Sequence, residues 1–164
     1  MNNLQISLKK LEILFLSFFG IGFMPKAPGT WGTLPAVPIV WAVHHFEVPI
    51  IFLIPFFVIT FIGSIYIINY TQKTYNVSDA SWIVIDEVLG FLFLTPFIKG
   101  NNLWHLLLAF ILFRIFDAAK IFPVNWFDTN VKGGLGVMLD DLVAAICSLV
   151  SYKVIIFGLT LVGF

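Results

Sequence analysis

Long apolar segments separated by short polar ones are the main feature of this sequence. The clearest segment runs from Val48 to Asn69 and contains no charged residue. Since a membrane-spanning helix needs about 20 largely apolar residues, this segment predicts a membrane span. The segment from Leu142 to Phe164 is also long enough, although Lys153 lies in its middle. That lysine could extend to the membrane interface or mark the end of a shorter helix, and the pattern leaves both readings open.

Other apolar segments are weaker candidates because charges or prolines interrupt them. Segment 82–98 contains two acidic residues, segment 103–116 has an arginine near its end, and segment 33–43 contains two prolines, which predict a short, broken or tilted helix. Residues 4–19 suggest an amphipathic helix at the membrane interface. Together these segments predict an all-α fold. We expect a polytopic membrane helix bundle of about four to five spans, formed as a single domain by residues 1–164.

The lengths of the connections predict which polar loops share a membrane face. The connections near His44 and Lys99 are short, so each would close a hairpin on one side of the membrane. Loops 20–33, 71–81 and 117–141 would then meet on the other side. Most of the lysines lie on this second side, and the positive-inside rule therefore predicts that it faces the cytoplasm.

Composition supports the membrane class and excludes several others. Apolar residues make up 60% of the chain and charged residues 11%, whereas a soluble domain carries about 25% charged residues. A soluble fold of 164 residues could not bury so much apolar surface. The formal net charge is zero, so nothing favours a nucleic-acid partner. The single cysteine, Cys147, rules out an internal disulfide and a multi-cysteine metal site.

Acidic residues are concentrated between positions 79 and 141. Seven of the nine acidic residues of the chain lie in this region: Asp79, Asp86, Glu87, Asp117, Asp128, Asp140 and Asp141. A carboxylate near the bilayer centre costs about 2.5–3.5 kcal/mol, so such residues need partners or a wet cavity. The adjacent Asp140 and Asp141 could simply favour a helix N-terminus, worth about 0.3–1 kcal/mol each. That explanation does not account for acidic residues from several segments on one predicted face, and a functional cluster does.

Two motifs predict that carboxylates and cations come together. Arg114, Asp117 and Lys120 recur every three residues, which places them on one face of a helix. They could form a weak ion-pair ladder, or they could offer a carboxylate to a metal ion and two cations to an anion. The motif "VIDEVLG" adds a carboxylate pair, followed by Gly90, which leaves room for a neighbouring helix. Carboxylate oxygens suit Mg²⁺, which usually binds a few carboxylates, several waters and substrate phosphate.

Two glycine-rich loops are candidates for anion binding. "PKAPGTWGT" contains Lys26 and Thr30, and "VKGGLGVM" contains Lys132, Gly133 and Gly134. Glycine allows backbone N–H groups to turn toward an anion. Neither loop matches a nucleotide-binding pattern, and each taken alone is also typical of an ordinary turn.

With these motifs the chain resembles the phosphatidylglycerophosphatase A family, whose members remove the terminal phosphate of phosphatidylglycerophosphate. The resemblance covers residues 20–145 and rests on "PKAPGTWGTLPAVP", "IVIDEVLG", "FRIFDAAKIFPVNWFD" and "VKGGLGVMLDD". One departure stands out. Residues 120–123 read Lys-Ile-Phe-Pro where the family usually reads K-P-W-P, a change that leaves every charged position in place.

The resemblance implies a Mg²⁺-dependent lipid phosphatase in the bacterial cytoplasmic (inner) membrane, with its active site facing the cytoplasm and a phospholipid, phosphatidylglycerophosphate, as substrate. The candidate metal ligands are Asp86, Glu87, Asp117, Asp128, Asp140 and Asp141. Catalytic roles are expected among Asp86, Glu87, Asp117 and Asp141. The candidate phosphate-binding residues are Lys26, Thr30, Arg114, Lys120, Lys132, Gly133 and Gly134.

A small ion-coupled membrane transporter is the alternative, because intramembrane carboxylates also mark ion paths. A carrier needs polar groups distributed across the depth of the membrane, whereas the pattern here predicts them at one face. The sequence leaves open the oligomeric state, the number of metal ions and which carboxylate acts as general base.

Overall fold

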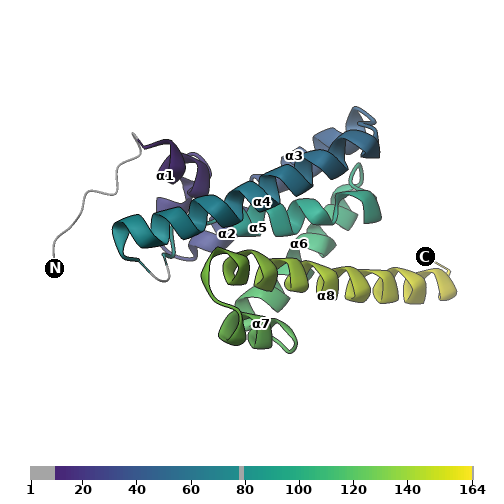
Figure 1. The fold of residues 1–164 in the computed structure, drawn as a ribbon. Helices are drawn as coiled ribbons and strands as arrows, with labels where there is room; N and C mark the ends of the chain where they lie inside the picture. The colour runs from purple at the N-terminus through teal and green to yellow at the C-terminus, as the bar shows by residue number, and fades with distance from the viewer. Residues whose placement is uncertain (1–9, 78–79, 164) are drawn as a thin grey trace.

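A computed structural model describes residues 10–77 and 80–163, and these residues form helices without any strand (Figure 1). The prediction of an all-α fold is confirmed. The α-helices are α1 (Leu11–Leu16), α2 (Pro28–Thr33), α3 (Ala36–His45), α4 (Ile50–Tyr75), α5 (Ile85–Phe93), α6 (Leu103–Ala119), α7 (Val124–Asn130) and α8 (Gly133–Leu161). The 3-10 helices are η1 (Ile21–Phe23) and η2 (Thr95–Phe97).

Helices α4 and α8 are the two longest and are, within the described part of the chain, the two long and apolar enough to cross a membrane. They contain 26 and 29 residues, which corresponds to about 40 Å each at 1.5 Å per residue. Most of α4 is exposed, and its buried residues form one narrow stripe made of Ser64, Ile68, Thr71 and Tyr75. An apolar helix with so little buried surface is typical of a lipid-facing span.

The predicted span at 82–98 is wrong. Helix α5 has only nine residues, or about 14 Å, and the chain turns at η2, which contains Pro96. This helix is apolar because it lies in the middle of the protein, where Val88, Leu89 and Phe91 are at most 1% exposed. Helix α6 has 17 residues and α3 has ten, so the expected count of four to five spans is not confirmed. The short α3, which contains Pro38, agrees with the prediction for segment 33–43.

The predicted loop 117–141 is also wrong, since most of it is helical. Helix α6 continues to Ala119, α7 follows, and α8 already begins at Gly133. Asp140 and Asp141 therefore lie two turns inside α8 and not at its N-terminus. Lys153 does not end this helix, because α8 continues to Leu161. The Lys153 ammonium instead donates a hydrogen bond to the carbonyl of Phe97 at 2.7 Å.

The predicted N-terminal amphipathic helix is described only in part, because residues 4–9 lie outside the described residues, as does Asp79. Helix α1 buries Ile13 and leaves Leu11 80% exposed, as an amphipathic helix would. Tyr75 at the end of α4 holds α1 in place: it accepts a hydrogen bond from Lys10 at 2.8 Å and donates one to Glu12 at 2.9 Å.

The two short connections meet at one end of the bundle, as the sequence predicts. The His44 ring lies 2.8 Å from the carbonyl oxygen of Thr95, and a Cβ atom on Gly100 would collide with this ring. Near the same end, the hydroxyl of Tyr152 lies 2.7 Å from the His105 ring. The starts of α5 and α8 and the end of α6 lie at the other end, which we call the site end (Figure 1).

Candidate functional site

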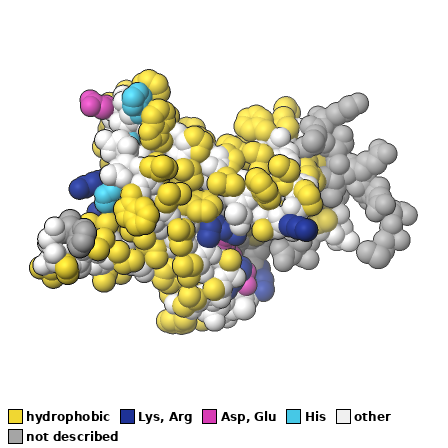
Figure 2. Space-filling model, turned by 180° about the vertical axis from the view of Figure 1, so that it is seen from behind, with side chains coloured by type: hydrophobic (Ala, Val, Ile, Leu, Met, Phe, Trp, Pro, Cys, Tyr) yellow, Lys and Arg dark blue, Asp and Glu magenta, His cyan; other side chains and the backbone are white. Residues whose placement is uncertain are grey.

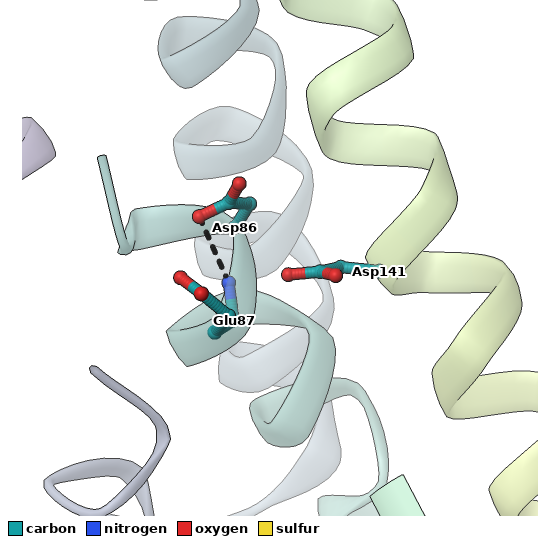
Figure 3. Close-up of side chains that lie close together, drawn as sticks. All are labelled: Asp86, Glu87 and Asp141. Carbon is teal, nitrogen blue, oxygen red and sulfur yellow. Dashed lines mark hydrogen bonds between the residues drawn. The ribbon is translucent and has the colours of Figure 1, made fainter. Parts of the chain in front are cut away.

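Three carboxylates come together at the site end, and we call them the carboxylate trio: Asp86 and Glu87 from the first turn of α5, and Asp141 from α8. One oxygen of each lies within 4.8 Å of the others. Figure 3 shows the three side chains close together, with Asp141 reaching from α8 toward Asp86 and Glu87 on α5. Asp86 accepts a hydrogen bond from the backbone N–H of Glu87 at 3.1 Å, which fixes the orientation of its carboxylate (Figure 3).

The glycine at position 90 makes this convergence possible. A Cβ atom there would lie 2.9 Å from Cζ of Phe113 in α6 and 3.2 Å from Cβ of Asp141 in α8. The first distance is shorter than real Cβ contacts, so a larger residue would force α5 away from its neighbours. The prediction that Gly90 leaves room for a neighbouring helix is confirmed, and the helix that uses this room carries a member of the trio.

The trio is largely buried, with Glu87 half-buried, and it is short of hydrogen-bond partners. Asp86 is 9% exposed and Asp141 is 3% exposed. One oxygen of Glu87 (Oε2) and one of Asp141 (Oδ2) are buried without a hydrogen-bond partner among the described residues. Buried carboxylates at this separation repel one another and lack compensating donors, which is unfavourable without a cation. The three residues therefore fit a hard cation such as Mg²⁺, which prefers carboxylate oxygens and water.

Arg114 of α6 borders the trio. Its guanidinium forms an ion pair with Asp117 one turn later and donates a weak hydrogen bond to the hydroxyl of Thr33 at 3.4 Å. Helix α2 comes so close that a Cβ atom on Gly29 would collide with the Glu87 carboxylate and lie 3.0 Å from Nη2 of Arg114. The first glycine loop thus leads into a helix that lies against both the acidic and the basic parts of the site.

Gly29 and Thr33 are site residues that were not predicted from the sequence. They lie four positions apart in α2, and the buried hydroxyl of Thr33 donates a hydrogen bond to the carbonyl of Gly29 at 2.8 Å. Their spacing in "PGTWGT" was the available signal. The predicted Thr30 lies beside Gly29 and is half-buried, whereas Lys26 lies before α2 and is exposed.

Two further aspartates extend the acidic group. Asp117 interacts electrostatically with Glu87 and Asp141, and Asp140 interacts with Asp86. Unlike the trio, both have ion-pair partners: Arg114 for Asp117, and Lys120 for Asp140. The surface view from behind shows Lys, Arg, Asp and Glu side chains gathered near the lower middle of a largely hydrophobic face (Figure 2).

Lys120, the residue directly after α6, forms ion pairs with two acidic residues. Its ammonium donates hydrogen bonds to Asp128 and, at 2.8 Å, to Asp140. Burial by itself lowers the pKa of Lys120, but these hydrogen bonds and charges outweigh it and raise the pKa well above its ordinary value. Lys120 therefore stays charged as a counter-ion. Asp128, with a 42% exposed side chain, is not part of the trio, although it was predicted from the sequence as a metal ligand.

The second glycine loop positions α8 against α4. Gly133 has a φ of +71°, which glycine adopts without strain, and the N–H of Gly134 donates to the side chain of Asn69 at 2.7 Å. A Cβ atom on Gly134 would collide with the backbone of Ile65. This N–H is thus occupied within the protein, so we assign Gly134 a packing role. Lys132, just before α8, is exposed.

Comparisons with known proteins agree with the resemblance in the sequence. The family model described as Phosphatidylglycerophosphatase A matches residues 14–156. A relative from Escherichia coli with this name is 38% identical over 131 residues, covering 79% of this chain and 74% of its own length. One from Haemophilus influenzae with the same name is 36% identical over 146 residues, covering 89% of each chain.

A third relative, from Bacteroides thetaiotaomicron, is named "Putative phosphatidylinositol-3-phosphatase" and is 35% identical over 146 residues, covering 85% of this chain and 90% of its own. No solved structure is significantly similar to the chain. The family match spans most of the chain and includes the trio, Arg114 and both glycine loops. The chain therefore belongs to the phosphatidylglycerophosphatase A family of enzymes.

Proposed function

We propose that the protein is a Mg²⁺-dependent lipid phosphatase that hydrolyses the terminal phosphate of phosphatidylglycerophosphate to phosphatidylglycerol and inorganic phosphate. The observation that carries this proposal is the carboxylate trio, which has two buried oxygens without a hydrogen-bond partner and is bordered by Arg114. Membership of the family and the names of the relatives from E. coli and H. influenzae support the choice of substrate.

Asp86, Glu87 and Asp141 would hold the Mg²⁺ ion. When bound, the ion would neutralise phosphate charge and lower the pKa of a water molecule. The chain's own residues do the rest. A carboxylate of the acidic group accepts a proton from water as the water oxygen bonds to phosphorus. The bond between phosphorus and the glycerol oxygen breaks, and that oxygen takes up the proton that the carboxylate releases. Asp117 is a candidate for this base, because it lies beside the trio without being one of its members.

Arg114 would bind the phosphate through its guanidinium, whose planar arrangement of donors matches two phosphate oxygens. Its Nε atom is buried and has no hydrogen-bond partner among the described residues, so the side chain keeps unused donor capacity. The exposed Lys26 and Lys132 would add positive charge from the two glycine loops. Lys120 is already bound to two carboxylates and would act on the phosphate at longer range.

The ion-coupled carrier has no support in the comparisons, which point to phosphatases. The distribution of charge argues against it as well. The trio and the two ion pairs beside it all lie at the site end, and Glu47 is exposed in the short connection after α3. A path across the membrane would need polar groups at intermediate depths.

The substrate can be tested with purified protein and defined lipids. We expect phosphate release from phosphatidylglycerophosphate to be faster than from phosphatidic acid or from phosphatidylinositol 3-phosphate, which the B. thetaiotaomicron relative's name suggests as a competitor. The measurement is inorganic phosphate released at equal lipid concentration. Faster release from another lipid would reassign the substrate, and no release from any of them would contradict the proposed function.

We further propose that the site end faces the cytoplasm across the bacterial inner membrane, with α4 and α8 spanning it. Single cysteines placed in a Cys147→Ser background test this orientation. A membrane-impermeant thiol reagent should label Glu47→Cys in intact cells, and should label Lys26→Cys and Lys132→Cys only after permeabilisation. Labelling of Lys132→Cys from outside would reverse the orientation.

A further inference from the structure

Three large apolar side chains are exposed beside the site, where the chain leaves α6 and enters α7. Ile121 is 44% exposed, Phe122 is 74% exposed and Trp126 is 52% exposed. We call these three residues the α7 rim. The rim is directly linked to the site, because Lys120, the residue before it, is hydrogen-bonded to Asp140 at 2.8 Å.

Several polar groups around the rim are hydrogen-bonded or paired within the protein. Lys120 and Asp128 form an ion pair with each other. On α7 itself, the hydroxyl of Thr129 donates to the carbonyl of Asn125 at 2.8 Å, and the Asn130 amide donates to the carbonyl of Trp126 at 2.7 Å. The rim can therefore enter an apolar layer without burying an unpaired charge or an unbonded donor from these residues.

Helix α6 leads to the rim along a continuous apolar stripe. Its exposed residues recur at four-residue intervals, which places them on one face: Leu103, Leu107, Ile111 and Ile115, between 42% and 66% exposed. No other described element covers this stripe. In a chain with two membrane-length helices, a stripe of this kind along a whole helix indicates contact with lipid hydrocarbon.

The position of the rim directly after α6 places it near the membrane interface on the site side. The 17 residues of α6 cover about 26 Å, less than the roughly 30 Å of a bilayer's hydrocarbon core, so the stripe reaches through most of that depth although α6 is not one of the two membrane-length helices. Trp104, at the first turn of α6, is 68% exposed, and Phe122 and Trp126 follow the other end. Exposed aromatic residues at both ends of an apolar stripe match the aromatic belts that mark the two interfaces of a membrane protein.

We propose that the α7 rim is a membrane anchor whose partner is the lipid surface. The rim enters the boundary between headgroups and acyl chains on the site side, and through Lys120 and Asp140 it holds the carboxylate trio at the depth of the lipid phosphates. This inference rests on the proposed membrane placement, but it does not depend on the reaction.

Spin labels on single cysteines test the anchor in protein reconstituted into phosphatidylglycerol-containing vesicles. In a Cys147→Ser background, a label at Phe122→Cys should collide more often with molecular oxygen, which concentrates in the bilayer, than with a water-soluble nickel complex. The matched control is Asn130→Cys on the same short helix, whose polar side chain is exposed; its label should favour the nickel complex. The oxygen-to-nickel ratio should therefore be several-fold higher at position 122.

A ratio at position 122 as low as that at position 130, with the nickel complex favoured at both, would place the rim in water and overturn the proposal. A label at position 122 that reaches neither collider would show that protein covers the rim, either a second copy or another chain, and would overturn it as well. If Phe122→Cys does not fold, Ile121→Cys carries the same expectation. Because the readout is not activity, a protein without phosphatase activity still tests the anchor.

Discussion

Treatment of the purified protein with EDTA is expected to abolish phosphate release, and added Mg²⁺ is expected to restore it. The physical reason is the trio, in which three carboxylates are gathered and two of their buried oxygens have no hydrogen-bond partner. Without a cation, this cluster has neither the charge to attract a phosphate nor a means to offset its own repulsion. The measurement is the rate of phosphate release before chelation, after it, and after Mg²⁺ is returned.

The control for metal dependence is Cys147→Ser. Cys147 lies six residues beyond Asp141 in α8 and is half-buried, and the proposed chemistry does not use it. The serine variant should keep most of the activity and the same response to EDTA. A folded but inactive serine variant would point to a thiol mechanism, and full activity in EDTA would remove the metal centre from the proposal.

Replacing single aspartates of the site should cost at least about a hundredfold in turnover, which corresponds to about 2.7 kcal/mol. We expect this loss for Asp86→Asn and Asp141→Asn, because asparagine keeps the shape of the side chain but removes the charge that a cation needs. Asp117→Asn should be similarly impaired, because the substitution removes a carboxylate that is both the ion-pair partner of Arg114 and the candidate base. The variants should still insert into the membrane, and turnover is measured with saturating Mg²⁺ and substrate.

Asp128→Asn is the matched control, with the same chemical change at a 42% exposed side chain outside the trio. An exposed ion pair contributes about 0–1 kcal/mol to folding stability, and Asp128 lies outside the trio, so this variant should fold normally and lose less than about fivefold in turnover. Glu47→Gln, at the other end of the bundle, should be near normal. The difference in turnover between these controls and the trio variants tests whether the metal ligands are the trio or the whole six-residue set predicted from the sequence. Near-normal turnover in Asp86→Asn and Asp141→Asn would remove the proposed site.

Several features of the protein follow from the sequence alone, because they depend only on composition and on residues close together along the chain. The scarcity of charge predicts the membrane class, since a soluble fold of this length cannot hide so much apolar surface, and the two membrane-length helices agree with it. The uncharged segment at 48–69 predicts α4, and the structure extends it by a few residues. Spacing also determines that Arg114 and Asp117 share a helix face, and the structure pairs them. Gly90 next to two carboxylates correctly predicted a close helix contact.

Other features depend on contacts between distant segments, which a local pattern does not contain. An apolar segment shows only that its surroundings are apolar, so α5, surrounded by protein, looked like a lipid-exposed span. The segment from Gly133 to Asp141 was predicted as part of a loop and contains three glycines and two aspartates, yet packing of Gly134 against α4 stabilises a helix there.

The choice of the trio among six candidate carboxylates also needed the tertiary structure. Asp140 and Asp141 are neighbours in the sequence but point in different directions from α8, so one meets Lys120 and the other meets α5. Thr33 and Gly29 join the site only because α2 packs against Arg114 and Glu87. The sequence by itself determined which residues could carry the chemistry, and the packing of α2, α5, α6 and α8 decided which of them meet.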